Sequence, residues 1–352
     1  MSDYQLIVIG AGPGGYTAAL EAARLGLHTA VVERREVGGT CLNRGCIPTK
    51  TLLHASQVYR DAVDGSPAGV HAGDITFNLG EMFAYKRAVS EKLRGGIHAL
   101  LKGARVDLLE GTARIDAPGR VTVAGPEGDT VYTADRILAA TGSVPVRPPI
   151  PGLDLPGVMT SDELLEGSDS LYESLVIMGG GVIGLELACA FAAFGTKITV
   201  VEMLPELLPR EQKEAVRVLT REMKKLGISM KTGAKMLRIE KNGELLRAVY
   251  ELKGAEEAVD CEQVLMAAGR RTNLSGIDAQ ALGLALDQKK CIMVDDHMRT
   301  NLPGVYAIGD VVGGYQLAHA AYAECEAALA DILGEDKPYG TMPVPVCTYT
   351  LP

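Results

Sequence analysis

Apolar runs, glycine turns and a helical segment follow one another at the start of the chain in the order of a βαβ unit. Residues 6–9 form a short apolar run that leads into a glycine turn. Residues 16–25 are expected to form a helix that ends at Gly26, and residues 29–33 form a second apolar run. Two short apolar strands joined by a helix predict a parallel strand pair.

The same order recurs in the second half of the chain. Residues 175–178 are expected to form a strand, residues 179–184 a glycine turn, residues 185–194 a helix and residues 197–202 the next strand. This repetition predicts the α/β class, with two Rossmann-like three-layer domains. Residues 175–196 carry only one charge, Glu186, and are long enough to cross a bilayer, but their glycines weaken a continuous helix. We therefore expect a buried strand, turn and helix there instead of a membrane span.

Shorter patterns predict the remaining elements. A long helix is expected at 79–102 and another at 317–333, and a proline-rich loop with a charged helix lies within 203–227. A hairpin turn is expected at 125–129. Strands are expected at 106–115, 121–123, 136–140, 229–239, 247–252 and 264–268. Proline and glycine cluster at 144–157, which indicates a connection into a second domain.

Composition and charge exclude several classes of protein. With 352 residues, 47% of them hydrophobic and 22% charged, the chain is expected to form more than one globular domain. A net charge of −9 disfavours nucleic acid or an anionic membrane as a partner. The N-terminus lacks the pattern of a signal peptide, so a cytoplasmic location is expected. Seven cysteines, an odd count in such a chain, argue against a disulfide scaffold.

Glycines in the first turn predict a dinucleotide site. Gly10, Gly12 and Gly15 form GxGxxG directly between strand and helix, and the acidic Glu33 follows 18 residues after Gly15. Such glycines permit a tight turn, a close approach of the backbone to a pyrophosphate at the helix N-terminus, and close packing of helix on strand. The carboxylate accepts hydrogen bonds from ribose hydroxyls.

The second turn repeats this arrangement. Gly179, Gly181 and Gly184 are followed by Glu202, again 18 residues after the last glycine. A carboxylate in this position repels a 2′-phosphate, so NAD is favoured over NADP. A duplicated fold with one inactive site is the alternative.

Two cysteines follow the first unit in the segment GGTCLNRGCIPTK, residues 38–50. Cys41 and Cys46 could be buried thiols, zinc ligands or a redox pair. Zinc is disfavoured because structural sites need about four ligands, and no second cysteine pair is present in the sequence. If a helix begins here, its dipole and the nearby Lys50 would stabilise a thiolate. A redox disulfide is the favoured interpretation, and no metal site is expected.

These motifs together resemble the pyridine nucleotide-disulfide oxidoreductase family, and the cysteine segment is closest to its dihydrolipoamide-oxidising members. The resemblance covers essentially the whole chain and includes both glycine units, the cysteine segment, residues 140–143 (ATGS), residues 268–271 (AGRR) and residues 309–310 (GD). It implies an FAD-binding domain with an NAD-binding domain inserted into it. The implied boundaries are 1–145 and 271–337 for the FAD part, 146–270 for the NAD part and 338–352 for the start of an interface domain.

The resemblance also implies the role of individual residues. Cys41 would exchange with the dithiol substrate, Cys46 would contact the flavin, and Lys50 and Glu186 would pair beside the flavin. The implied FAD contacts are Gly10, Gly12, Gly14, Gly15, Glu33, Gly39, Thr40, Lys50, Ala113, Thr141, Gly142, Asp310 and Ala318, with His319 beside the last. The implied NAD contacts are Gly179, Gly181, Gly184, Glu202, Met236 and Gly269.

As an activity, the resemblance implies electron transfer from dihydrolipoamide through the cysteine pair and FAD to NAD. The implied partners are a dihydrolipoyl-bearing acyltransferase or lipoyl carrier protein, and a second copy of the chain. Mercuric or glutathione reductases of the same family are alternatives, as is a flavin-binding fragment with a structural disulfide. The smaller thioredoxin reductases fit less well, because their cysteine pair lies in the nicotinamide domain.

The sequence departs from the family after residue 337. The family continues with an interface domain, which supplies most of the dimer contact and a His-Glu pair for acid-base work. Residues 343–350 are expected to form the first strand of that domain, cut short. His28 with Glu33 and His319 with Glu324 have the spacing of such a pair but not its placement. We therefore expect FAD binding and slow turnover of dihydrolipoamide.

Overall fold

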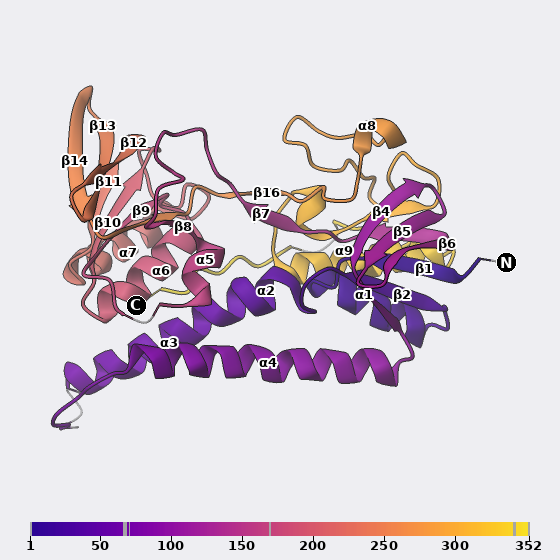
Figure 1. The fold of residues 1–352 in the computed structure, drawn as a ribbon, viewed down its shortest axis with the longest axis horizontal. Coiled ribbons are helices and arrows are strands. Elements are labelled where there is room, and N and C mark those ends of the chain that lie inside the picture. The colour runs from indigo at the N-terminus through magenta and orange to yellow at the C-terminus, as the bar shows by residue number, and fades with distance from the viewer. Residues whose placement is uncertain (1, 66–68, 70, 169, 341–342, 351–352) are drawn as a thin grey trace. The chain divides into compact units, whose positions relative to one another are not determined.

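The computed structural model describes residues 2–65, 69, 71–168, 170–340 and 343–350 (Figure 1). It divides into two compact units, each assembled from separate stretches of the chain. The first unit contains Met1–Asn43, Ser90–Val144 and Arg271–Val346, and the second contains Arg44–Val89, Pro145–Arg270 and Cys347–Pro352. The strands β7 (Ser143–Pro145) and β16 (Arg270–Thr272) lie where the chain passes from one unit to the other.

A seven-stranded sheet forms the centre of the first unit. Its order is β3-β2-β1-β6-β5-β4, and β17 pairs with β6. Strands β1, β2, β3, β6 and β17 pair in parallel, whereas β4 and β5 form an antiparallel meander with the first part of β6. The bounds are β1 Tyr4–Ile9, β2 Thr29–Glu33, β3 Asp107–Glu110, β4 Thr112–Ala117, β5 Arg120–Gly125, β6 Gly128–Ala139 and β17 Val305–Ala307.

Helices α1 (Pro13–Arg24) and α9 (Ala318–Ile332) contact each other in this unit. The parallel strands are apolar on both faces, as sheets covered by helices require. Their buried side chains include Ile7, Val32 and Ile137. The short helix η1 (Gly309–Val312) follows β17 directly, at the end of the sheet where the glycine loop after β1 also lies.

The second unit holds a five-stranded parallel sheet in the order β11-β10-β9-β15-β8. A separate antiparallel sheet in the order β12-β13-β14 belongs to the same unit. The bounds are β8 Val158–Thr160, β9 Ser174–Met178, β10 Lys197–Glu202, β11 Ser229–Thr232, β12 Ala234–Asn242, β13 Leu245–Leu252, β14 Ala255–Cys261 and β15 Gln263–Met266. Helix α3 (Cys46–Val63) packs on α6 (Val182–Ala193) through a core that includes Leu52, Leu53 and Leu185.

The remaining helices complete the fold. Their bounds are α2 Gly39–Arg44, α4 Leu79–Gly103, α5 Ser161–Glu166, α7 Lys213–Lys225 and α8 Ala279–Leu282. The predicted long helix at 79–102, the charged helix within 203–227 and the helix at 317–333 are confirmed, and so is the hairpin turn at 125–129. None of the helices that the structure describes combines the length and apolar character of a membrane span. The predicted strand, turn and helix at 175–196 are confirmed as β9 and α6.

The structure also differs from the expectation. Helices α1 and α6 begin at Pro13 and Val182, three residues before the predicted starts, because the last glycine of each motif lies inside the first helical turn. Strand β14 was not expected, since four of its first five residues, in AEEAV, are exposed and lack the alternation of a half-buried strand. The prediction of a strand at 343–350 is wrong, because these residues are not in a strand and pair with no described strand.

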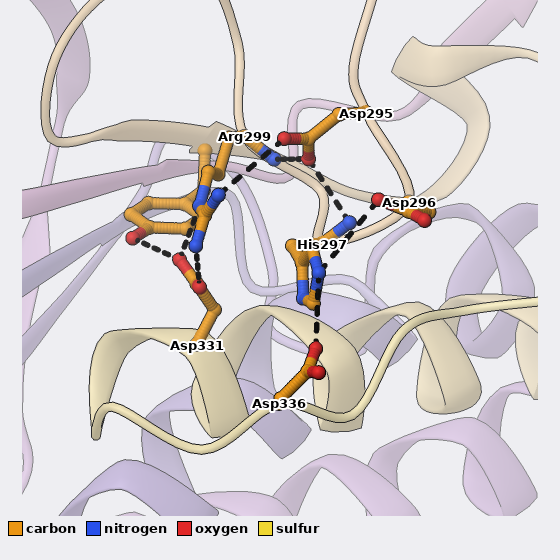
Figure 2. A network of polar contacts seen from close by, with 7 residues as sticks. Asp295, Asp296, His297, Arg299, Asp331 and Asp336 are labelled. Carbon is orange, nitrogen blue, oxygen red and sulfur yellow. Dashed lines mark hydrogen bonds and ion pairs between the residues drawn. The ribbon is translucent and has the colours of Figure 1, made fainter.

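A polar network holds the C-terminal end of α9 in the first unit (Figure 2). Asp331 on α9 accepts hydrogen bonds from Arg299 Nε at 2.7 Å and from the hydroxyl of Tyr306, on β17, at 2.8 Å. His297 Nε2 lies 3.4 Å from Asp336 Oδ1, just beyond the helix. The hydrogen bonds from Arg299 lower the pKa of Asp331, so its carboxylate stays charged at neutral pH. Helix α9 is therefore fixed to the edge of β17.

Candidate active site and cofactor-binding loops

The first glycine loop joins β1 to α1. A Cβ on Gly15 would lie 1.8 Å from the carbonyl oxygen of Gly10, so no side chain fits there. On Gly12 the nearest atom would be Gly39 Cα at 4.0 Å, and no side chain caps the helix that begins after it. The loop thus offers free space in front of backbone N–H groups at a helix N-terminus, as a pyrophosphate requires.

Glu33 ends β2 beside this loop. Its Oε2 accepts a hydrogen bond from Ala11 N at 2.8 Å, and its Oε1 accepts one from Arg35 N at 2.9 Å. Each carboxylate oxygen can accept a second hydrogen bond. The side chain is therefore held in a fixed orientation while it keeps acceptor capacity for a ribose hydroxyl.

The second glycine loop repeats this geometry between β9 and α6. A Cβ on Gly184 would lie 2.2 Å from Gly179 O, whereas one on Gly181 would meet, among the described residues and apart from its neighbours in the chain and the backbone of its own helix, no atom within 4 Å. Glu202 Oε2 accepts from Gly180 N at 2.6 Å, and Oε1 accepts from Leu204 N at 2.6 Å. Both glycine loops therefore have the predicted strand-loop-helix form, each in its own unit. In both, open space lies before the N-terminus of a helix without a side-chain cap, and this arrangement fits the pyrophosphate of a dinucleotide.

Asp310 lies in η1 of the first unit. Its carboxylate accepts a hydrogen bond from the hydroxyl of Ser143. The amide of Gly309, the preceding residue, donates to Glu324 Oε2 at 2.6 Å. The pKa of Glu324 is raised to about 7, mainly by burial and to a smaller extent by the charge of Asp310, while the Gly309 hydrogen bond acts in the opposite direction.

The other predicted FAD contacts of the first unit lie on several elements. Thr141 Oγ1 donates to Asn273 O at 2.6 Å, and Asn273 N donates to Gly142 O at 2.9 Å, which fixes the ATGS turn. Ala318 is the first residue of α9, and the neighbouring His319 Nε2 lies 2.7 Å from Pro345 O. Ala113 on β4 is buried. Gly14 lies in α1, and Thr40 in α2.

The cysteine segment forms two successive helices. Gly39 begins α2, which carries the partly exposed Cys41. Gly45 precedes α3 without a side-chain cap, and the exposed Cys46 is the first residue of that helix. A sulfur at the first position of an 18-residue helix lies in the field of its N-terminal amides, which stabilises the thiolate form.

Lys50 and Glu186 pair in the second unit. Lys50 Nζ lies 2.7 Å from Glu186 Oε2, and this ion pair joins α3 to α6. Lys50 is four residues after Cys46, on the same face of α3. Tyr349 completes the group, because its backbone N–H donates to Glu186 Oε1 at 2.9 Å and its ring centroid lies 4.8 Å from Lys50 Nζ.

Two predicted NAD contacts remain. Gly269 is exposed, and its carbonyl accepts from Val146 N at 3.0 Å. Met236 is buried on β12, in the same core cluster as Val176 and Tyr250. The structure thus places Gly269 at the surface of the unit and packs Met236 into its interior.

The sequence did not single out three residues that contact the predicted ones. Ser143 belongs to the quoted ATGS turn, so its position was a usable signal. In the sequence Glu324 stands out only as half of a His-Glu spacing, and nothing in the pattern indicates its bond to Gly309. Tyr349 had no local signal, because it reaches Glu186 from 163 positions away in the chain.

Comparisons with known proteins show which proteins this chain is similar to. The model of the family described as pyridine nucleotide-disulphide oxidoreductase matches residues 4–325. The dihydrolipoyl dehydrogenase of Geobacillus stearothermophilus is 34% identical over 355 residues, covering 99% of this chain and 74% of the relative. That of Thermus scotoductus is 38% identical over 355 residues, covering 100% and 75%.

Solved structures give the same result. The flavoprotein disulfide reductase RclA of Escherichia coli, in a Cu(II) complex, superposes with a TM-score of 0.85 at 30% identity, covering 96% of this chain and 73% of that one. LpdA of Mycobacterium tuberculosis gives a TM-score of 0.89 at 27% identity, covering 98% and 76%. The chain therefore spans about three quarters of the length of these relatives.

This chain belongs to the pyridine nucleotide-disulfide oxidoreductase family. It is an oxidoreductase with the fold of the flavoprotein disulfide reductases, and proteins of this family use FAD and NAD(H).

Proposed function

We propose that this protein is a dihydrolipoyl dehydrogenase, which transfers two electrons from dihydrolipoamide through Cys41 and Cys46 and FAD to NAD⁺. The observation that carries the proposal is the arrangement on α3. There Cys46 occupies the first helical position, and Lys50, one turn later, pairs with the buried Glu186. The names of relatives at 34% to 38% identity support the same activity.

The two cysteines perform the thiol chemistry of this proposal. A thiolate of the substrate attacks Cys41 Sγ, the Cys41–Cys46 bond breaks, and Cys46 leaves as a thiolate. The second substrate thiol, once deprotonated, attacks the substrate sulfur of the mixed disulfide. The substrate leaves as a cyclic disulfide and Cys41 as a thiolate, so the cysteine pair has gained two electrons and two thiol protons have been released.

The positions of the side chains support Cys46 as the better leaving group of the two. The N-terminal amides of α3 stabilise negative charge on its sulfur. Lys50 adds a positive charge on the same face, and Glu186 holds that charge in place. Cys41 lies in α2, a helix of six residues with a much smaller dipole.

The loops of the two units divide the cofactors between them in this proposal. FAD would be held by the loop from Gly10 to Gly15, with Glu33 at its ribose and Asp310 at its ribitol. NAD would be held by the loop from Gly179 to Gly184 and by Glu202. When bound, FAD supplies a two-electron acceptor and NAD⁺ accepts a hydride.

The proposed partners follow from the substrate. A dihydrolipoyl group is presented by an acyltransferase or a lipoyl carrier protein, and a homodimer is proposed for the whole enzyme. A glutathione or mercuric reductase that uses NADPH is less compatible with Glu202, because a carboxylate at the ribose repels a 2′-phosphate.

Steady-state assays of the FAD-loaded protein test the proposal. We expect reduction of NAD⁺ by dihydrolipoamide, and a lower kcat/KM for oxidation of NADPH by glutathione disulfide. The opposite preference would show a different disulfide reductase. Activity with neither pair, in protein that retains FAD, would favour a flavin-binding protein with a structural disulfide.

A further inference from the structure

Glu324 is a buried carboxyl group that the thiol chemistry described above does not use. It lies on α9, is 5% exposed, and accepts a hydrogen bond from Gly309 N at 2.6 Å. A carboxyl group in a buried position is costly unless it has a task or a partner. Its partner here is the backbone N–H of Gly309, the residue directly before Asp310.

The turn that Glu324 contacts has a demanding geometry. Gly309 has a φ of +75°, in the left-handed region, and it begins the short helix η1. The hydrogen bond from its amide to Glu324 links this turn to α9. Helix α9 is itself fixed at its C-terminal end, where Asp331 is bound by Arg299 and Tyr306 (Figure 2).

We infer that Glu324 is a positioning residue for Asp310, and that its ionisation makes the retention of FAD dependent on pH. This inference rests on the proposed function, in which Asp310 binds the ribitol of FAD. The hydrogen bond to Gly309 holds the turn, and the Ser143 hydroxyl donates a hydrogen bond that orients the Asp310 carboxylate.

The direction of the pH effect follows from the two neighbouring carboxyl groups. The charge of Asp310 on η1 raises the pKa of Glu324. The charge of Glu324 in turn contributes to the raised pKa of the Tyr339 phenol, which follows α9 in the chain. Bound FAD would exclude water from Asp310 and so strengthen the repulsion between two ionised carboxylates. FAD therefore binds better when Glu324 is protonated, and its affinity falls as the pH rises through about 7.

FAD titrations of the apoprotein between pH 5.5 and 8.5, followed by flavin fluorescence, test the inference. For the wild type we expect the dissociation constant to increase about threefold to tenfold over this range. Glu324→Gln retains a carbonyl acceptor for Gly309 and cannot ionise, so its affinity should be independent of pH and match that of the wild type at low pH. Glu324→Ala should bind FAD more weakly at every pH.

Glu326→Gln is the matched control, since Glu326 lies on the same helix but is exposed and paired with Lys337. It should show the wild-type pH profile. If the wild type and Glu324→Gln show identical pH profiles, the inferred role of Glu324 is overturned and the proposed function is unaffected. Failure of the folded wild type to bind FAD at any pH would overturn the proposed function as well.

Discussion

Lys50 Nζ and Glu186 Oε2 lie 2.7 Å apart, and the two side chains differ strongly in their exposure to solvent. The Glu186 side chain is 3% exposed, whereas that of Lys50 is 35% exposed. Glu186 also accepts the backbone N–H of Tyr349. The carboxylate is thus the buried partner and Lys50 the one that can still be hydrated.

This asymmetry predicts unequal costs of removing either side chain. Lys50→Met leaves a buried carboxylate without its counter-charge, and such a change typically destabilises a protein by about 3 kcal/mol or more. Glu186→Gln leaves a lysine that water can reach and an amide that still accepts a hydrogen bond, so about 1 kcal/mol is expected. Urea unfolding of the apoproteins measures both values. Equal losses of unfolding free energy, or a larger loss for Glu186→Gln, would contradict the asymmetry. Lys225→Met, which removes a lysine from an ion pair at the surface, is the control.

The second glycine loop allows a sharp comparison of two alanine substitutions. Gly181→Ala adds a methyl group at a position where, apart from neighbours in the chain and the backbone of its own helix, no atom of the described residues lies within 4 Å, so the fold should be unchanged. If the pyrophosphate of NAD occupies this space, the affinity should fall at least about tenfold, or 1.4 kcal/mol. Gly184→Ala places Cβ 2.2 Å from Gly179 O and should destabilise the unit by about 1 to 3 kcal/mol. Calorimetric titration with NADH and thermal unfolding separate the two effects.

That comparison has a clear contrary result. A Gly181→Ala protein that binds NADH as tightly as the wild type would show that the ligand does not lie in front of this residue.

Glu202 is expected to set the preference between NAD and NADP. Its carboxylate is fixed by Gly180 N and Leu204 N beside the loop, where a 2′-phosphate would meet a negative charge. The wild type should therefore bind NADH more tightly than NADPH by about a hundredfold, close to 3 kcal/mol. Glu202→Gln should reduce this ratio at least about tenfold, as measured by two dissociation constants. Glu33→Gln is the matched control, and an equal change of the ratio in that variant would refute the assignment.

The stability of the protein should depend on pH through Glu324. Its pKa is about 7 in the folded protein against an ordinary value of 4.5, so the folded state binds more protons than the unfolded state between these values. The free energy of unfolding therefore falls as the pH rises from 4.5 to 7, by about 2 to 3 kcal/mol in total. Glu324→Gln should raise the melting temperature of the apoprotein at pH 8 and change it little at pH 4.5. A Glu324→Gln protein without this gain at pH 8 would argue against a raised pKa.

Much of the fold could be predicted because its signals are local. The glycine turns, the apolar runs around them and the long helix ending at Gly103 all depend on neighbouring residues, and the structure places them as expected. The starts of α1 and α6 were misplaced because a glycine inside a helical turn looks the same in sequence as one in a loop.

The contacts around the site were less accessible to prediction. The pairing of Lys50 with Glu186 came from the family resemblance, since the residues are 136 positions apart. The bond between Glu324 and Gly309 depends on how α9 packs after β17, and no periodicity reports that packing. Tyr349 reaches Glu186 only through the tertiary fold.

The most direct test of the account is anaerobic reduction of the FAD-loaded protein by dihydrolipoamide, with and without each cysteine of the motif. The account predicts flavin reduction in the wild type and in Cys347→Ser, an exposed cysteine outside the motif, and its loss in Cys41→Ser and Cys46→Ser. Flavin reduction at the wild-type rate in Cys41→Ser or Cys46→Ser would contradict the central claim that electrons enter through this pair.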